Sequence, residues 1–126
     1  MNTGDTLDLE VPKITRTTLA LYAGASGDHN PVHIDLDACA AVGIPDVFSH
    51  GMLSMAYLGR LLTDHYEQER IRSFSVRFSA ITPVNSTPRC TGTVVSIENG
   101  LASLDLTMAL SDGTVTLRGS AIVATN

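Results

Sequence analysis

The stretch Gly51–Leu62, which reads GMLSMAYLGRLL, decides the fold that we predict for this chain. It is rich in helix-forming residues, and Ser49 or His50 just before it can cap a helix that runs to about Tyr66. Apolar residues occupy every side of its first three turns, whereas a helix at a protein surface shows a single apolar stripe. We therefore predict a long helix that the rest of the chain wraps.

The second half of the chain supplies strands for this wrapping. Apolar and polar residues alternate there with the period of two that is typical of a half-buried strand. The alternating segments cover residues 73–80, 89–97, 102–110 and 115–123. Asn99-Gly100 and Asp112-Gly113 connect the last three, and both dipeptides favour tight type I′ hairpins. We therefore expect an antiparallel meander.

The first half of the chain contributes one strand and two shorter helices. The alternating residues 7–11 indicate a short strand. Residues 15–25 are predicted to form a helix that Thr15 caps and Gly27 ends, and residues 36–42 a second, shorter one. One sheet that curls around one long helix is the hot-dog fold, an α+β architecture.

Association of subunits is expected from this architecture. A small sheet around one helix has two exposed edges and a core that is incompletely covered, and oligomerisation removes both problems. We therefore expect a homodimer whose long helices pack together and whose sheets join edge to edge. A heterodimer with a related hot-dog subunit, or a higher oligomer, is compatible with the same reasoning.

The composition excludes several classes of protein. The chain has 126 residues, which we interpret as a single domain over residues 1–126. With 13 acidic and 8 basic residues its net charge is −5, which argues against a nucleic-acid partner. No segment reaches the roughly 18 apolar residues of a membrane helix, and no signal peptide is recognised at the start. Cys39 and Cys90 are far apart in sequence and form no C-x-x-C motif, which indicates two reduced thiols. We expect a soluble, cytoplasmic protein.

The loop between the two shorter helices holds the first candidate for chemistry. It reads GDHNPVH over residues 27–33, so that two titratable groups, Asp28 and His33, lie five residues apart. Gly27 and Pro31 constrain the backbone between them, and loops on a rigid scaffold commonly carry catalytic groups. Taken singly, Asp28 is best interpreted as a turn or cap residue, and His33 as a partly buried histidine whose hydrogen bonds are satisfied. Taken together, they are also a candidate acid–base pair.

The start of the long helix, Ser49-His50-Gly51, is the second candidate. The first amides of a helix lack internal partners and lie at its positive end. Gly51 has no side chain, so a carbonyl oxygen can approach its amide closely and be stabilised there. Taken alone, Gly51 is better explained by close packing of the helix start.

A metal site is not expected. The two candidate segments together contain four residues with metal-ligating side chains: Asp28, His29, His33 and His50. Their spacing matches no zinc signature, and no further carboxylate or thiol completes the set. His29 is predicted to face solvent, and His65 to be a polar residue at the end of the long helix.

These residues resemble a known family, the MaoC-like (R)-specific enoyl-CoA hydratases and 3-hydroxyacyl dehydratases. Residues 22–33, YAGASGDHNPVH, look like that family's hydratase motif, and the Gly-Asp-x-Asn-Pro-x-His core is specific. His50-Gly51-Met52 and residues 77–84 resemble two further landmarks. The similarity covers nearly the whole chain and is especially close to the short dehydratase subunits of actinobacterial fatty-acid and mycolic-acid elongation.

The resemblance implies reversible syn addition of water to a trans-2-enoyl thioester, which gives the (R)-3-hydroxyacyl thioester. Asp28 and His33 would hold the water between them, with either one as the base, and Asn30 would brace the loop or the pair. The Gly51 amide would stabilise the thioester oxygen. Coenzyme A or acyl carrier protein would be part of the substrate, and no metal or redox cofactor is implied.

Two other functions stay open. Hot-dog acyl-CoA thioesterases share the fold, but they usually place a carboxylate on the long helix, and this helix has none before Asp64. The chain can also be a subunit of a heteromer. The presence of both Asp28 and His33 argues against a non-catalytic subunit, but not against a catalytic subunit that needs a non-catalytic partner chain.

Overall fold

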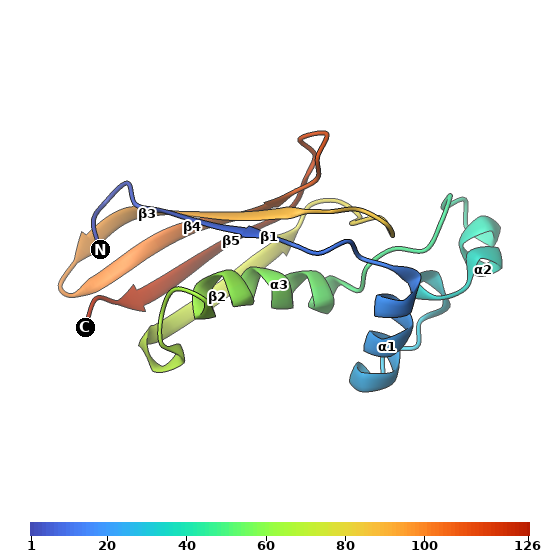
Figure 1. Cartoon of the computed structure of the whole chain (residues 1–126), viewed down its shortest axis with the longest axis horizontal. Coiled ribbons are helices and arrows are strands. Elements are labelled where there is room, and N and C mark those ends of the chain that lie inside the picture. The colour runs from blue at the N-terminus through green and yellow to red at the C-terminus, as the bar shows by residue number, and fades with distance from the viewer.

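A five-stranded antiparallel sheet curves over one long helix in the computed structural model, which describes residues 1–126 (Figure 1). The strands are β1 (Thr6–Glu10), β2 (Ile71–Phe78), β3 (Arg89–Glu98), β4 (Leu101–Ala109) and β5 (Val115–Ala124). They lie in the order β1-β3-β4-β5-β2. This arrangement confirms the predicted hot-dog fold. Only β3, β4 and β5 form the meander, because β2 pairs with β5 at the far edge of the sheet.

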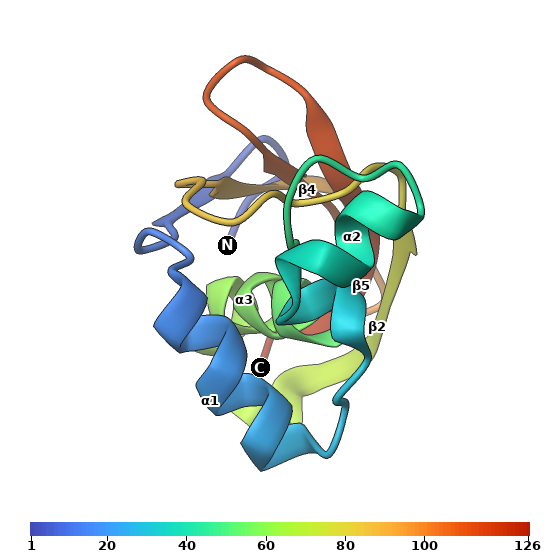
Figure 2. The ribbon, with the colours of Figure 1, turned by 90° about the vertical axis from the view of Figure 1, so that its right-hand side faces the viewer.

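The helices are arranged so that two of them stand at one end of the third. The long helix α3 (Gly51–Thr63) lies against one face of the sheet, while α1 (Arg16–Ser26) and α2 (Leu36–Ala41) gather beside its start (Figure 2). Two short 3₁₀ turns are η1 (Pro31–His33) and η2 (Gln68–Arg70). No helix has both the length and the apolar character that a membrane crossing requires.

The sheet covers one side of α3 only. Leu58, Leu61 and Leu62 are fully buried in the core that α3 shares with the sheet. Met52, in contrast, is 60% exposed, and Ala56 is exposed as well. The expectation that the chain wraps this helix on every side is therefore wrong for a single subunit, since five strands curl around only part of a helix. An apolar face of α3 is left without cover.

The two predicted hairpin turns differ. Asn99 and Gly100 both have positive φ angles, 53° and 75°, as a type I′ turn requires, so this prediction is confirmed. Of the second pair only Gly113 has a positive φ, 91°, so Asp112-Gly113 is not a type I′ turn. The Gly113 N–H donates to the Leu110 carbonyl, and the register shifts just before this turn. The extra residues make a wider, bulged connection instead.

Candidate active site

The loop that follows α1 is fixed by its own hydrogen bonds. Gly27 ends α1 in the left-handed conformation, with φ of 77°, as predicted. The Asn30 N–H donates to the Asp28 carboxylate over 3.2 Å, and the Asn30 side-chain oxygen accepts from the Val32 N–H over 3.3 Å. Asn30 therefore caps η1, and Pro31 occupies the first position of that turn, where its missing N–H is not needed. Gly27, Asn30 and Pro31 thus fix the local shape of the loop.

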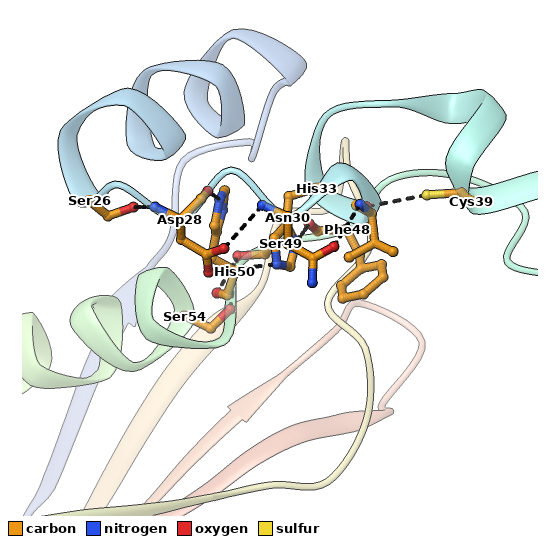
Figure 3. A network of polar contacts seen from close by, with 10 residues as sticks. Ser26, Asp28, Asn30, His33, Cys39, Phe48, Ser49, His50 and Ser54 are labelled. Carbon is orange, nitrogen blue, oxygen red and sulfur yellow. Dashed lines mark hydrogen bonds and ion pairs between the residues drawn. The ribbon is translucent and has the colours of Figure 1, made fainter. Parts of the chain in front are cut away.

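Asp28 and His33 face each other across this loop (Figure 3). The Asp28 Oδ2 and the His33 Nε2 are 3.9 Å apart, which is too far for a direct hydrogen bond. The same distance lets one water molecule contact both atoms. The Asp28 side chain is 51% exposed and that of His33 only 9%. The pair therefore has one member open to solvent and one held in the protein.

A main-chain bond selects the tautomer of His33. Its Nδ1 lies 2.8 Å from the carbonyl oxygen of Phe48, and a carbonyl can only accept a hydrogen. Nδ1 of a neutral His33 therefore carries the proton, and Nε2 presents its lone pair toward Asp28. Phe48 is itself tied down, because its N–H donates to the Val32 carbonyl and it bridges to Pro83.

The start of α3 presents free amide groups beside the pair. His50 is the N-cap residue, but no side chain caps the helix. The Ser49 hydroxyl donates to the His50 carbonyl and lies 3.0 Å from the Ser54 hydroxyl, so it is directed away from the helix amides. The prediction that Ser49 or His50 caps the helix is therefore right in position, since His50 is the N-cap residue, but neither residue caps the helix through its side chain. As a result, no acceptor in the chain pairs with the Gly51 amide.

The space over Gly51 is bordered by an aromatic ring. A Cβ atom placed on Gly51 would lie 3.2 Å from the Phe78 ring, which is tight, but Phe78 is 52% exposed and can turn outward. A groove of about 330 Å³ runs past this point between α3 and β2. Apolar and small polar residues line it, among them Phe48, Gly51, Ser54, Phe78, Ile81 and Leu117. Gly51 thus borders a cavity that can receive a ligand, whereas Asp28 and His33 are not among its lining residues.

His50 lies closer to the pair than the sequence indicated. It is completely buried, its Nε2 donates to the Asp28 carbonyl over 3.1 Å, and its ring stacks on that of His33 with centroids 4.0 Å apart. The sequence placed His50 only at the start of the helix. His29 is exposed, as predicted, but the local sequence did not indicate that His50 is buried against the loop. Only the fold, which brings α3 against the loop, reveals this contact.

The same three side chains are the only ones that approach each other as metal ligands do. Ligand atoms of Asp28, His33 and His50 lie within 4.8 Å of one another. The two rings are stacked with only 26° between their planes. Because an imidazole binds a metal through a lone pair in its ring plane, stacked rings direct these lone pairs side by side and not toward one point. This arrangement is unfavourable for one metal ion bound by both rings.

The two cysteines play no part in this pair. Cys39 is buried and donates its S–H to the Val32 carbonyl over 3.2 Å, which helps to hold the loop. Burial raises the pKa of the Cys39 thiol, and it raises the pKa of the Cys90 thiol to about 12. Both are free thiols, as predicted, and both stay protonated at neutral pH.

Comparison with known proteins identifies the family. Residues 2–113 match the model of the MaoC like domain. The 3-hydroxyacyl-thioester dehydratase Z of Mycobacterium tuberculosis is 32% identical, over 86% of this chain and 74% of that protein. The chain therefore belongs to the MaoC-like dehydratase family, and it is an enzyme of the hydratase and dehydratase class.

Solved structures confirm the fold at lower identity. The ChsH1-ChsH2 complex from Mycobacterium tuberculosis contains a chain that superposes with a TM-score of 0.88 at 21% identity, over 100% of this chain and 99% of that one. The (R)-hydratase from A. caviae involved in PHA biosynthesis superposes with a TM-score of 0.85 at 22% identity, over 100% and 98% of the two chains.

Proposed function

We propose that this enzyme adds water reversibly and with syn geometry to a trans-2-enoyl thioester, giving the (R)-3-hydroxyacyl thioester. The observation that carries the proposal is the gap of 3.9 Å between the Asp28 Oδ2 and the His33 Nε2, beside the unpaired amide of Gly51. Coenzyme A or acyl carrier protein carries the acyl group as a thioester. The reaction needs neither a metal nor a redox cofactor, because it only moves a water molecule and protons.

In the proposed mechanism the water lies between Asp28 and His33. One of the two accepts a proton from it while its oxygen attacks C3 of the enoyl group and the C2–C3 double bond opens. The negative charge moves onto the thioester oxygen. The pair then delivers a proton to C2 on the same face, so that its protonation state is restored. The fixed Nδ1–H of His33 keeps the Nε2 lone pair available at the start of each cycle.

The thioester oxygen docks on the Gly51 amide in this proposal. Charge develops on that oxygen in the transition state, and a fixed donor at the positive end of a helix stabilises it without reorganisation. α3 has 13 residues, so its first turn carries the full effect of the helix dipole. The groove beside Gly51 leaves room for the rest of the substrate.

The direct test is the purified chain alone with crotonyl-CoA. Hydration removes the enone absorbance, and chiral analysis of the product is expected to give the (R)-3-hydroxy isomer. Loss of absorbance without an (R) product would contradict the proposed stereochemistry. A chain that is folded but inactive alone, and active when a related hot-dog subunit is added, would be a catalytic subunit of a heteromer.

The same assay separates a hydratase from a thioesterase. Saturated acyl-CoA with a thiol reagent is expected to release no free thiol, because a hydratase does not break the thioester. The only carboxylate at the end of α3 is Asp64, which is exposed and lies 3.7 Å from Arg60 in an ion pair. Release of thiol at a rate comparable with hydration would make the chain a thioesterase.

We further propose that the open face of α3 and the edge of β2 form a dimer interface. β2 pairs with β5 on one side only, and Phe78 on β2 and Met52 on α3 are both more than half exposed. Joining two such edges would pair the free backbone groups and cover these apolar side chains. The second subunit is a copy of this chain or a related hot-dog subunit.

An arginine placed on that face is expected to separate the subunits. Ala56 is exposed on α3, and arginine has nearly the helix propensity of alanine, so Ala56→Arg costs the single subunit little. Light scattering is expected to show a dimer for the wild type and a monomer for Ala56→Arg. Ala20→Arg, on the exposed side of α1, is the matched control and is expected to stay dimeric. A wild-type chain that is monomeric and active would contradict the proposal.

A further inference from the structure

His50 is a buried side chain that contacts three separate parts of the site. Its ring stacks on His33 of η1 and meets the ring of Tyr22 of α1 edge to face, with centroids 4.7 Å apart. Its Nε2 lies 3.1 Å from the carbonyl oxygen of Asp28. His50 thereby links the start of α3 to both members of the candidate pair (Figure 3).

The hydrogen bonds define the state of this ring. The Asp28 carbonyl can only accept, so the His50 Nε2 carries a hydrogen. The His50 Nδ1 is buried and has no partner at all. A second proton there would add a charge and an unpaired donor in the protein interior, both of which are costly. Burial is the largest cause that lowers the pKa of His50, against the opposing hydrogen bond to Asp28. His50 is therefore neutral at neutral pH.

We propose that His50 is a positioning residue: as a neutral Nε2–H imidazole it holds the backbone of Asp28 through one hydrogen bond and supports the ring of His33 by stacking. This inference rests on the proposed function of the pair. The Asp28 side chain is half exposed, and the other hydrogen bonds of this residue are local: its N–H donates to the hydroxyl of Ser26, the last residue of α1, and its carboxylate accepts from the Asn30 N–H. The His50 hydrogen bond is the one that ties Asp28 to a segment distant in sequence, the start of α3.

Two substitutions separate the hydrogen bond from the ring. His50→Phe keeps an aromatic ring against His33 and Tyr22 but removes the donor. His50→Gln removes the ring but offers an amide N–H to the Asp28 carbonyl. We expect kcat for crotonyl-CoA to fall by about 10- to 100-fold in His50→Phe, with KM little changed, because a displacement of about 1 Å in a catalytic group can have this effect. His50→Gln is expected to regain most of the lost kcat.

A matched control lies just beyond the other end of the same helix. His65, beyond the other end of α3, also bonds a backbone carbonyl, with its Nδ1 2.8 Å from that of Leu61. His65→Phe is expected to leave kcat unchanged. Equal losses of kcat in His50→Phe and His50→Gln, in proportion to their losses of melting temperature, would reduce His50 to a packing residue. Full kcat in a folded His50→Phe would also overturn the proposal.

Two further measurements do not depend on catalytic activity. In ¹⁵N spectra of the histidine rings, His50 is expected as the neutral Nε2–H tautomer at pH 7; an Nδ1–H or doubly protonated ring would overturn the proposal. Hydrogen exchange over residues 27–33 is expected to rise in His50→Phe and not in His50→Gln. If wild-type protein hydrated no enoyl thioester, the proposed function would fail, whereas these two measurements would still decide whether His50 holds the loop.

Discussion

Asp28→Asn is expected to reduce the hydration of crotonyl-CoA by about 10²- to 10⁴-fold, the typical contribution of a general acid–base group. The asparagine side-chain oxygen can still accept from the Asn30 N–H, so the loop keeps its shape. The amide can no longer take a proton from the water. Stopped-flow or steady-state loss of enone absorbance measures the effect, and circular dichroism checks the fold. A well-folded Asp28→Asn protein that keeps most of its turnover would contradict the assignment.

His33 allows a corresponding test with two variants. His33→Ala is expected to nearly abolish turnover, although it also leaves the Phe48 carbonyl without its donor. His33→Asn can still donate to that carbonyl but has no group in the place of Nε2, so it is expected to be as inactive as His33→Ala and more stable. The control is His29→Ala in the same loop, which changes an exposed side chain and is expected to keep full activity.

Gly51→Val is expected to lower turnover by about 10²- to 10³-fold with only a small fall in melting temperature, because it blocks the approach of the thioester oxygen to a donor that stabilises the transition state. Valine at a helix start has little propensity cost. Its Cβ would lie 3.2 Å from the ring of Phe78, a close contact that a shift of the ring by a few tenths of an ångström relieves. Turnover and melting temperature are measured on the same purified variant.

A double variant separates the two explanations for Gly51. Phe78→Ala in the Gly51→Val background removes the ring that the valine would contact. If valine blocks the amide, the double variant stays far less active than Phe78→Ala alone, which accounts for the loss of Phe78 from the groove and from the proposed interface. Recovery of turnover in the double variant would instead show that Gly51 is needed for packing against Phe78. Full specific activity of the folded Gly51→Val protein would rule out docking of the oxygen on this amide.

The fold and the members of the loop were predictable from the sequence because they depend on local rules. Alternation with a period of two marked the strands, and Thr15 and Gly27 marked the two ends of α1. The constrained loop singled out Asp28 and His33, and the structure places them face to face. Each of these signals lies within a few residues of what it predicts.

Two of the three features that the sequence missed depend on contacts between distant segments. His50 reaches Asp28, 22 residues earlier, only because α3 starts beside the end of α1. Met52 is exposed because five strands curl around only part of α3. The apolar pattern of the helix does not show how far the sheet curls. Ser49 resembles a cap in sequence, but its hydroxyl finds Ser54 and the His50 carbonyl instead. Tertiary contacts decided the first two, whereas the Ser49 contacts are local, one and five residues along the chain.

The bonds that orient this site end on main-chain atoms. His33 donates to the carbonyl of Phe48, His50 donates to the carbonyl of Asp28, and the unpaired donor at Gly51 is a backbone amide. No substitution of a side chain deletes a main-chain carbonyl. The residues that line the groove can therefore change in size and polarity during evolution while the acid–base geometry persists. If the proposed function holds, such a site is well suited to acquire new acyl substrates without a change in its acid–base groups.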